Sequence, residues 1–149
     1  MIALETGLNA FGLRFHHFGW IVPAPEKATS FLVVLGYVAE TAVFDPLQQV
    51  NLRMMTHASM PDVELIWPGP GDSPVTRLLR RGHMIYHACY VTDDAEASLA
   101  AMAAAGQDVL PVSPAQPAIL FGGVKVSFHA IDEVGLIELI HGMPGKPGV

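Results

Sequence analysis

Two histidines and two glutamates stand out because they recur at matched places in the two halves of the chain. His17 and His87 each lie near the start of a short β-type segment, and they are 70 positions apart. Glu64 and Glu138 each interrupt an apolar segment near the end of their half, and they are 74 positions apart. Strand alternation points both carboxylates inward, where an ionised group needs a cation or another partner. These four residues together predict a site for one divalent metal ion.

This donor set also indicates a kind of chemistry. Two imidazole nitrogens and two carboxylate oxygens suit Ni, Co, Zn, Mn or Fe, so the identity of the metal stays open. A six-coordinate ion would keep two positions for water or for two oxygens of a substrate. Such an ion can stabilise the enediolate that forms when a carbon next to a carbonyl loses its proton. We expect Glu138 to be the general base for that proton, with Glu64 as the near-symmetric alternative.

Each of these residues has a structural interpretation when it is taken alone. A histidine in an aromatic strand is more often a packed, hydrogen-bonded residue than a metal ligand. A single glutamate in an apolar strand more often forms a salt bridge, for which Arg53 and Lys125 are available. The matched positions of all four residues favour the metal site. The other histidines lack matched partners and are expected to be surface or hydrogen-bonding residues, with His129 the strongest exception.

The elements that must position these residues form an internal repeat. In each half, a β-type segment that carries the histidine precedes a helix. A glycine ends that helix 19 positions after the histidine, at Gly36 and at Gly106. Further strand-type segments follow in each half. The expected fold class is therefore α+β, with two tandem βαβββ modules that form an open, curled mixed β-sheet.

The repeat also predicts boundaries within one domain that covers the whole chain. Module one, a connector, module two and a flexible tail are expected at about 15–68, 69–83, 84–142 and 143–149. Helices are expected over 26–35 and 95–105, and a short connector helix is expected to begin with Pro74. The expected strands are 15–22, 38–44, 50–56, 63–67, 86–91, 108–112, 124–130 and 136–140.

The composition limits the class of protein. With 149 residues, of which 51% are hydrophobic and 15% charged, the chain can bury a core without disulfides, and disorder is excluded. The 8 basic and 14 acidic residues leave a net charge of −6, so nucleic acid is not an expected partner. The single cysteine and the absence of a basic leader or a long apolar run indicate a cytoplasmic protein without a membrane partner. A small-molecule substrate is expected, and the hydrophobic content is compatible with a homodimer.

Four segments resemble the vicinal-oxygen-chelate (VOC) superfamily over nearly the whole chain; in order, they are FHHFGWIV, DVELIW, YHACYV and GLIELIHG. The segments DSPVTRLLRRG and PAILFGGVKVSF add a likeness to bacterial glyoxalase I and to methylmalonyl-CoA epimerases. The resemblance implies two βαβββ modules around a metal held by His17, Glu64, His87 and Glu138. The epimerases usually carry glutamine where this chain has Glu64. This departure favours a glyoxalase I-like (lactoylglutathione lyase-like) reaction on a hemithioacetal or a related thioester.

Three other functions on the same fold remain open from the sequence. A methylmalonyl-CoA epimerase-like racemase would need a second catalytic carboxylate, for which only Asp45 is available. An extradiol-type oxygenase normally uses two histidines and one carboxylate, so Glu64 as a fourth ligand disfavours it. A metal-free small-molecule-binding protein of this superfamily would lack the four ligands.

Overall fold

The computed structural model describes residues 10–82 and 84–142. The described part of the chain divides into two compact units. The module-one unit lies within residues 17–87, and the module-two unit consists of residues 10–16 and 88–142. His83 and the predicted tail at 143–149 lie outside the described residues. Among the described residues, no helix is long and apolar enough to cross a membrane.

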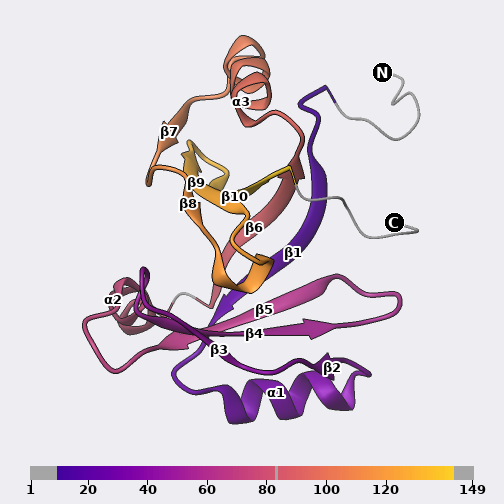
Figure 1. Ribbon diagram of the computed structural model, residues 1–149, viewed down its shortest axis with the longest axis vertical. Coiled ribbons are helices and arrows are strands. Elements are labelled where there is room, and N and C mark those ends of the chain that lie inside the picture. The colour runs from indigo at the N-terminus through magenta and orange to yellow at the C-terminus, as the bar shows by residue number, and fades with distance from the viewer. Residues whose placement is uncertain (1–9, 83, 143–149) are drawn as a thin grey trace. The chain divides into compact units, whose positions relative to one another are not determined.

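The module-one unit is a mixed sheet with the helix α1 beside it (Figure 1). Its elements in chain order are β1 Arg14–Ile21, α1 Pro25–Val34, β2 Val38–Ala39, β3 Val43–Asp45, β4 Val50–Thr56, β5 Asp62–Pro68 and α2 Pro74–Arg80. The strands follow the order β2-β4-β5-β1, and β3 also pairs with β4. β1 and β5 run parallel, whereas β4 pairs antiparallel with its neighbours. The ligand-bearing strands β1 and β5 are therefore direct neighbours.

The helix α1 covers one face of this sheet. It begins at Pro25, where the missing N–H of proline removes a donor that would have no partner within the helix. It ends before Gly36, whose φ of 96° is in the left-handed region. Leu32 of α1 packs with Val63 and Leu65 of β5 in a buried core. Because side chains alternate along a strand, Glu64 lies on the opposite face of the sheet.

The single strand predicted over 38–44 is wrong, because two short strands occupy this region and both pair with β4. Ala39 pairs with Met55, and Val43 pairs with Leu52. The four-residue distance from Ala39 to Val43 thus lies opposite a three-residue distance from Met55 to Leu52 on β4. One extra residue on one strand is the geometry of a β-bulge. The alternation of residue types did not show this extra residue, because a bulge depends on the partner strand.

The module-two unit repeats the plan of the module-one unit. Its elements are β6 Ile85–Thr92, α3 Ala95–Ala104, β7 Val109–Pro111, β8 Gln116–Pro117, the 3-10 turn η1 Ile119–Phe121, β9 Lys125–Ile131 and β10 Gly135–His141. The strands follow the order β6-β10-β9-β7, and β8 also pairs with β9. β6 and β10 run parallel, and β10 and β9 run antiparallel. The predicted α+β class and the tandem βαβββ modules are confirmed.

The helix α3 covers one face of the module-two sheet, as α1 does in module one. Its N-cap is Asp94, whose side chain accepts a hydrogen bond from the backbone N–H of Ala97. Met102 of α3 packs with Leu139 of β10 in a buried core. Glu138, the neighbour of Leu139 along the strand, therefore lies on the face away from the helix. Both modules thus place a glutamate on the face opposite their helix.

Candidate metal centre

Three of the four predicted ligands come together inside the module-one unit, which includes the start of β6 and ends at His87. Nε2 of His17 lies 3.4 Å from Nε2 of His87 and 3.8 Å from Oε2 of Glu64. Oε1 of Glu64 lies 3.9 Å from Nε2 of His87. The three residues are almost fully buried, with exposed fractions of 0%, 4% and 2% for His17, Glu64 and His87. Donor atoms from three strands therefore face one point in the interior.

The spacing and charge of these donors fit a divalent ion. Ligands at about 2.1 Å from a metal have neighbouring donor atoms about 3.0 Å apart in a six-coordinate ion and about 3.4 Å apart in a tetrahedral one. The observed separations of 3.4 to 3.9 Å would contract by less than about 1 Å to reach either geometry. Burial lowers the pKa of His87 to about 3, so the imidazole is neutral at pH 7 and keeps a lone pair for a metal.

The sheet register explains why the three side chains converge. His17 pairs with Asp62, and Gly19 pairs with Glu64, so these residues share the face away from α1. Gly19 has a steric role, because a Cβ atom at this position would lie 2.4 Å from Cε1 of His87. Only glycine at position 19 leaves room for the His87 imidazole. This requirement was not predicted, and the glycine two positions after His17 was its sequence signal.

Glu138 occupies the equivalent register in the module-two unit. It pairs with Cys89 of β6, just as Glu64 pairs with Gly19 of β1. Only 4% of Glu138 is exposed. Burial raises the pKa of Glu138 to about 7, and a hydrogen bond from the Cys89 thiol acts in the opposite direction. Because Glu138 belongs to the other unit, its place in the metal quartet remains a prediction.

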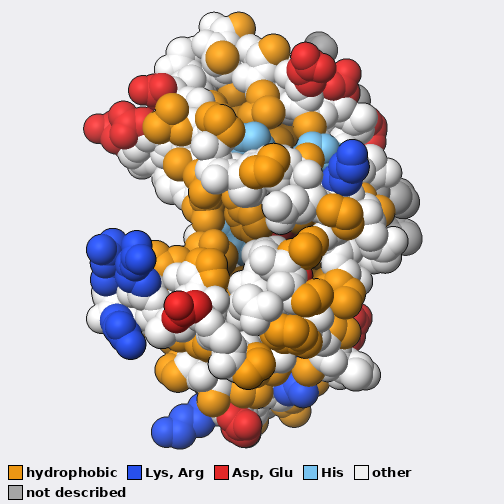
Figure 2. Space-filling view, turned by 60° about the vertical axis from the view of Figure 1, so that its left-hand side comes forward, with side chains coloured by type: hydrophobic (Ala, Val, Ile, Leu, Met, Phe, Trp, Pro, Cys, Tyr) orange, Lys and Arg blue, Asp and Glu red, His pale blue; other side chains and the backbone are white. Residues whose placement is uncertain are grey.

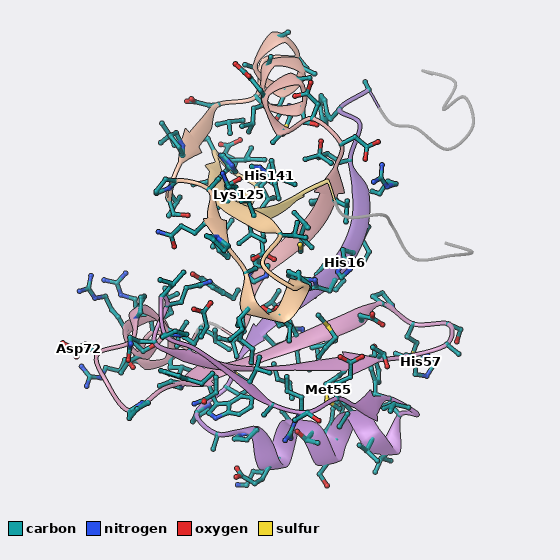
Figure 3. All side chains as sticks on the ribbon, viewed as in Figure 1. His16, Met55, His57, Asp72, Lys125 and His141 are labelled. Atoms are coloured by element: carbon teal, nitrogen blue, oxygen red, sulfur yellow. The ribbon has the colours of Figure 1, made fainter. Side chains whose placement is uncertain are left out.

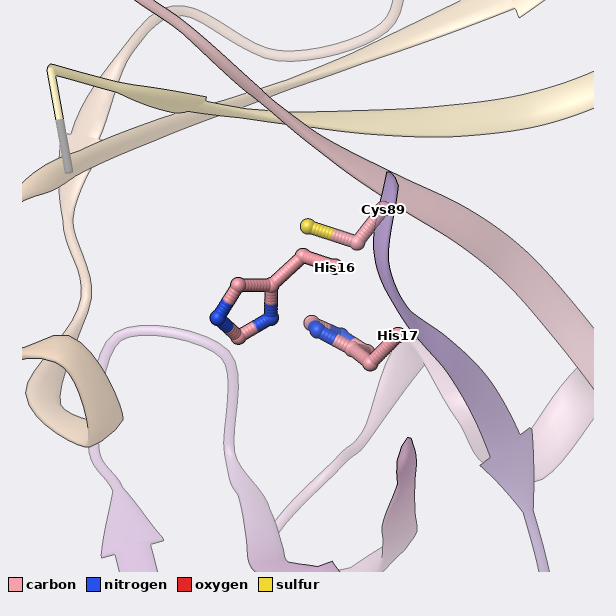
Figure 4. A group of neighbouring side chains, drawn as sticks. All are labelled: His16, His17 and Cys89. Carbon is pink, nitrogen blue, oxygen red and sulfur yellow. The ribbon is translucent and has the colours of Figure 1, made fainter. Parts of the chain in front are cut away.

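Cys89 and His16 are neighbours inside the module-two unit. Cys89 is buried and has a free thiol, and its Sγ and a ring nitrogen of His16 lie within 4.8 Å of each other (Figure 4). The His16 ring also packs edge-on against Phe121, with the ring centroids 5.5 Å apart. His16 therefore has a packing role within its own unit.

A second group of histidines lies on β9 and β10. Ser127 Oγ is 2.9 Å from Nε2 of His129 and 2.8 Å from Nε2 of His141. His141 lies beside Lys125 (Figure 3). Burial lowers the pKa of both histidines; the charge of His141 adds to this for His129, and the charge of Lys125 adds to it for His141. His129, the strongest exception among the other histidines in the sequence, is thus a hydrogen-bonding residue. Its position two residues after Ser127 on the same strand was the sequence signal for this cluster.

The structural alternative for Glu64 was a salt bridge to Arg53. Arg53 instead donates a hydrogen bond to Thr29 Oγ1 at 3.1 Å. Its guanidinium carbon lies 5.8 Å from the centre of the Trp67 ring. Arg53 pairs with Leu65 of β5, and Trp67 packs against the buried core beneath α1, so both lie on the helix-covered face of the sheet. Glu64 lies on the opposite face. Glu64 therefore lies with the two imidazoles, and Arg53 has other partners.

Asp45, the candidate for a second epimerase carboxylate, shapes a turn. Its Oδ1 accepts hydrogen bonds from the backbone N–H groups of Leu47 at 2.8 Å and Gln48 at 3.3 Å. Its Oδ2 accepts a third from the Gln48 side chain at 3.2 Å. Asp45 is 3% exposed. These bonds satisfy the carboxylate inside the turn between β3 and β4, which is a structural role.

Comparisons with known proteins agree with this fold. The family model described as Glyoxalase/Bleomycin resistance protein/Dioxygenase superfamily matches residues 16–128. The comparison with curated protein sequences gives no match.

Three solved structures illustrate the likeness. The hypothetical protein BH1468 from Bacillus halodurans C-125 is 20% identical, with a TM-score of 0.71 over 91% of this chain and 99% of that chain. Methylmalonyl-CoA epimerase from Mycobacterium tuberculosis is 20% identical, with a TM-score of 0.71 over 96% of this chain and 95% of that chain. A variant of Streptomyces coelicolor methylmalonyl-CoA epimerase in complex with 2-nitronate-propionyl-CoA is 20% identical, with a TM-score of 0.65 over 88% and 98%. At these identities the likeness establishes the fold alone.

Proposed function

Because the chain belongs to the glyoxalase/bleomycin resistance protein/dioxygenase superfamily, we propose that it is a metal-dependent enzyme that moves a proton on a carbon next to a carbonyl group. The observation that carries this proposal is the convergence of His17, Glu64 and His87 on one buried point. A divalent cation at that point would stabilise the buried carboxylate. The proposed substrate is a small hemithioacetal or thioester in the cytoplasm.

The residues take separate roles in this reaction. His17, Glu64 and His87 would hold one divalent ion, which is Ni, Co, Zn, Mn or Fe, and Glu138 would be its fourth ligand. When bound, the ion stabilises the negative charge that develops on the carbonyl oxygen as the carbon loses its proton. Glu138 is the proposed general base. Glu64 is the alternative base.

Two reactions share this proton transfer. A glyoxalase I-type lyase can move the proton between neighbouring carbons with one carboxylate. A two-base epimerase removes the proton on one side of a carbon and returns it on the other, and so needs a second base. The hydrogen bonds of Asp45 within its own turn therefore support the one-base reaction. The epimerases of similar fold support the alternative, with a second base other than Asp45.

Metal content is the first test. We expect about one metal ion per chain after the purified protein is loaded with Ni, Co, Zn, Mn or Fe. The Glu64→Gln, Glu138→Gln double variant should lose it. Glu40→Gln removes an exposed carboxylate of the module-one unit and is the matched control. Absence of metal from the wild-type protein after loading with each of the five ions would contradict the proposal and favour the metal-free binding protein.

Activity is the second test. The metal-loaded protein is incubated in deuterated water with hemithioacetals and with 2-methyl thioesters, and deuterium at the carbon next to the carbonyl is measured by NMR. Exchange that requires the metal and Glu138 supports the proposed proton transfer. Sedimentation of the same sample tests whether the enzyme is a homodimer.

A further inference from the structure

The two halves of the repeat differ in the residue that lies directly opposite each glutamate. Glu64 pairs with Gly19 across β5 and β1. Glu138 pairs with Cys89 across β10 and β6. Gly19 brings no side chain, and the His87 ring lies where its Cβ atom would be. Cys89 brings a thiol, which can donate a hydrogen bond and has no role in the proposed proton transfer.

Cys89 and Glu138 share one buried face of the module-two sheet. Residues paired across neighbouring strands project to the same side. Tyr90 and Leu139, the next pair along, pack on the side of α3, so the thiol and the carboxylate lie on the side away from this helix. Cys89 is fully buried, and Glu138 is 4% exposed. In this interior the thiol donates a hydrogen bond to the carboxylate.

A buried carboxylate depends on fixed donors for its orientation. Groups of acidic side chains project from the surface in the space-filling view (Figure 2), and water can solvate such groups in any rotamer. Glu138 is almost fully buried, so protein groups must hold its oxygens in place. The Cys89 thiol is such a group, and it comes from a paired strand. Because S–H is a weak donor, it can orient the carboxylate and still leave it able to accept a proton.

We propose that Cys89 positions Glu138 as the general base, and that Glu138 rather than Glu64 therefore takes the proton from the substrate. This inference rests on the proposed function, because it assigns the base of the same reaction. A general base must lie within hydrogen-bond reach of the proton that it removes, and a base that is already oriented needs no rearrangement at the moment of transfer. The repeat thus duplicates the ligands, but only module two adds a donor that orients its glutamate.

Two other acceptors lie near the thiol. The backbone oxygen of Tyr90 is 4.0 Å from Sγ of Cys89, which is a long contact even for sulfur. A ring nitrogen of His16 lies within 4.8 Å of the same sulfur atom (Figure 4). An ionised carboxylate is a stronger acceptor than a carbonyl oxygen, so we expect the thiol to donate to Glu138. The identity of this acceptor is therefore the first point to test.

Infrared spectroscopy of the metal-free full chain identifies the acceptor. Cys89 is the only cysteine, so the S–H stretching band belongs to one residue and should disappear in Cys89→Ala. Glu138→Gln should shift the band to higher wavenumber at pH 8, because an amide oxygen accepts more weakly than a carboxylate. Glu133→Gln, the matched control, removes an exposed carboxylate of the same unit and should leave the band in place. An unaltered band in Glu138→Gln would overturn the inference.

Deuterium exchange by the metal-loaded full chain tests the positioning role, with the hemithioacetals and 2-methyl thioesters as probes. Cys89→Ala should lower kcat at least about tenfold and leave KM within about threefold, because the base loses its orientation while the substrate keeps its contacts. Cys89→Ser keeps a donor at the same place and should restore kcat to within about threefold of wild type. Serine and alanine are both smaller than cysteine, so equal rates in the two variants would indicate a packing role and overturn the inference.

A double-mutant cycle tests which glutamate the thiol acts through. In excess metal, Cys89→Ala should have no further effect on exchange in the Glu138→Gln background, and it should still slow exchange in the Glu64→Gln background. The reverse pattern would assign the base to Glu64 and overturn the inference. Metal content is measured on the same samples. Metal-dependent exchange by the wild type with any of these contrary results leaves the proposed function standing, whereas a wild type without metal and without exchange overturns the proposed function and with it the assignment of the base.

Discussion

Replacement of Glu138 by glutamine should stabilise the metal-free protein at neutral and alkaline pH. Burial raises the pKa of this carboxyl from 4.5 to about 7, so its ionised form is unfavourable in the fold. Each pKa unit corresponds to about 1.4 kcal/mol, so the rise costs about 3 kcal/mol when Glu138 is fully ionised. Glutamine keeps the shape and hydrogen-bonding capacity of the side chain without the charge.

The sign of the effect defines its pH range. Between pH 4.5 and about 7 the folded protein binds more protons at Glu138 than the unfolded chain does, so wild-type stability falls as the pH rises through this range. The difference between Glu138→Gln and wild type should therefore be near zero at pH 4 and reach about 3 kcal/mol above pH 8. For a chain of this size, that corresponds to a rise in the melting temperature of about 6–12 °C.

Urea unfolding of the metal-free proteins across this pH range measures the effect directly. Glu133→Gln removes an exposed carboxylate from the same unit and should show no comparable pH-dependent gain. Addition of excess metal should reverse the order, because a ligand that binds only the folded wild type stabilises it. A Glu138→Gln variant that is no more stable than wild type at pH 8 would refute the claim that this carboxylate is destabilised by burial.

Three other substitutions test separate parts of the structure. Gly19→Ala should weaken metal binding at least about tenfold, because the new Cβ would occupy the place of the His87 ring. Competition with a chelator measures the affinity, and an unaltered value would contradict this geometry. Asp45→Asn should keep the rate of proton exchange within about twofold, and Asp45→Ala should cost about 1–2 kcal/mol of stability through lost turn hydrogen bonds; loss of exchange in Asp45→Asn would revive the two-base reaction. Because the pKa values of His129 and His141 are lowered in the fold, the free energy of unfolding should fall as the pH drops below about 6.5. The His129→Gln, His141→Gln double variant should show a smaller fall in urea unfolding. An equal fall would exclude these two residues as its cause.

The sequence predicted the repeated modules because their signals are local. A glycine ends each long helix, the strands alternate in residue type, and these patterns recur at offsets of 70 to 74 positions. The helix starting at Pro74 was predicted for the same reason, since proline at the first helical position is a local preference. The match of Glu64 and Glu138 was also visible, and the structure places both on the face opposite their helix.

Other features depend on contacts between segments that are distant in the sequence. The extra residue between Ala39 and Val43 exists only relative to β4, and the role of Asp45 depends on the path of the turn that follows it.

The types and spacing of His17, Glu64 and His87 thus determined which residues could serve as ligands, because a duplicated unit repeats its chemistry at equivalent positions. Only the tertiary structure decided that their donor atoms lie 3.4 to 3.9 Å apart, since this depends on the register between strands. It also decided that Gly19 must lack a side chain and that Cys89 lies directly opposite Glu138. Such distances arise from packing between segments, which no local pattern of residues encodes.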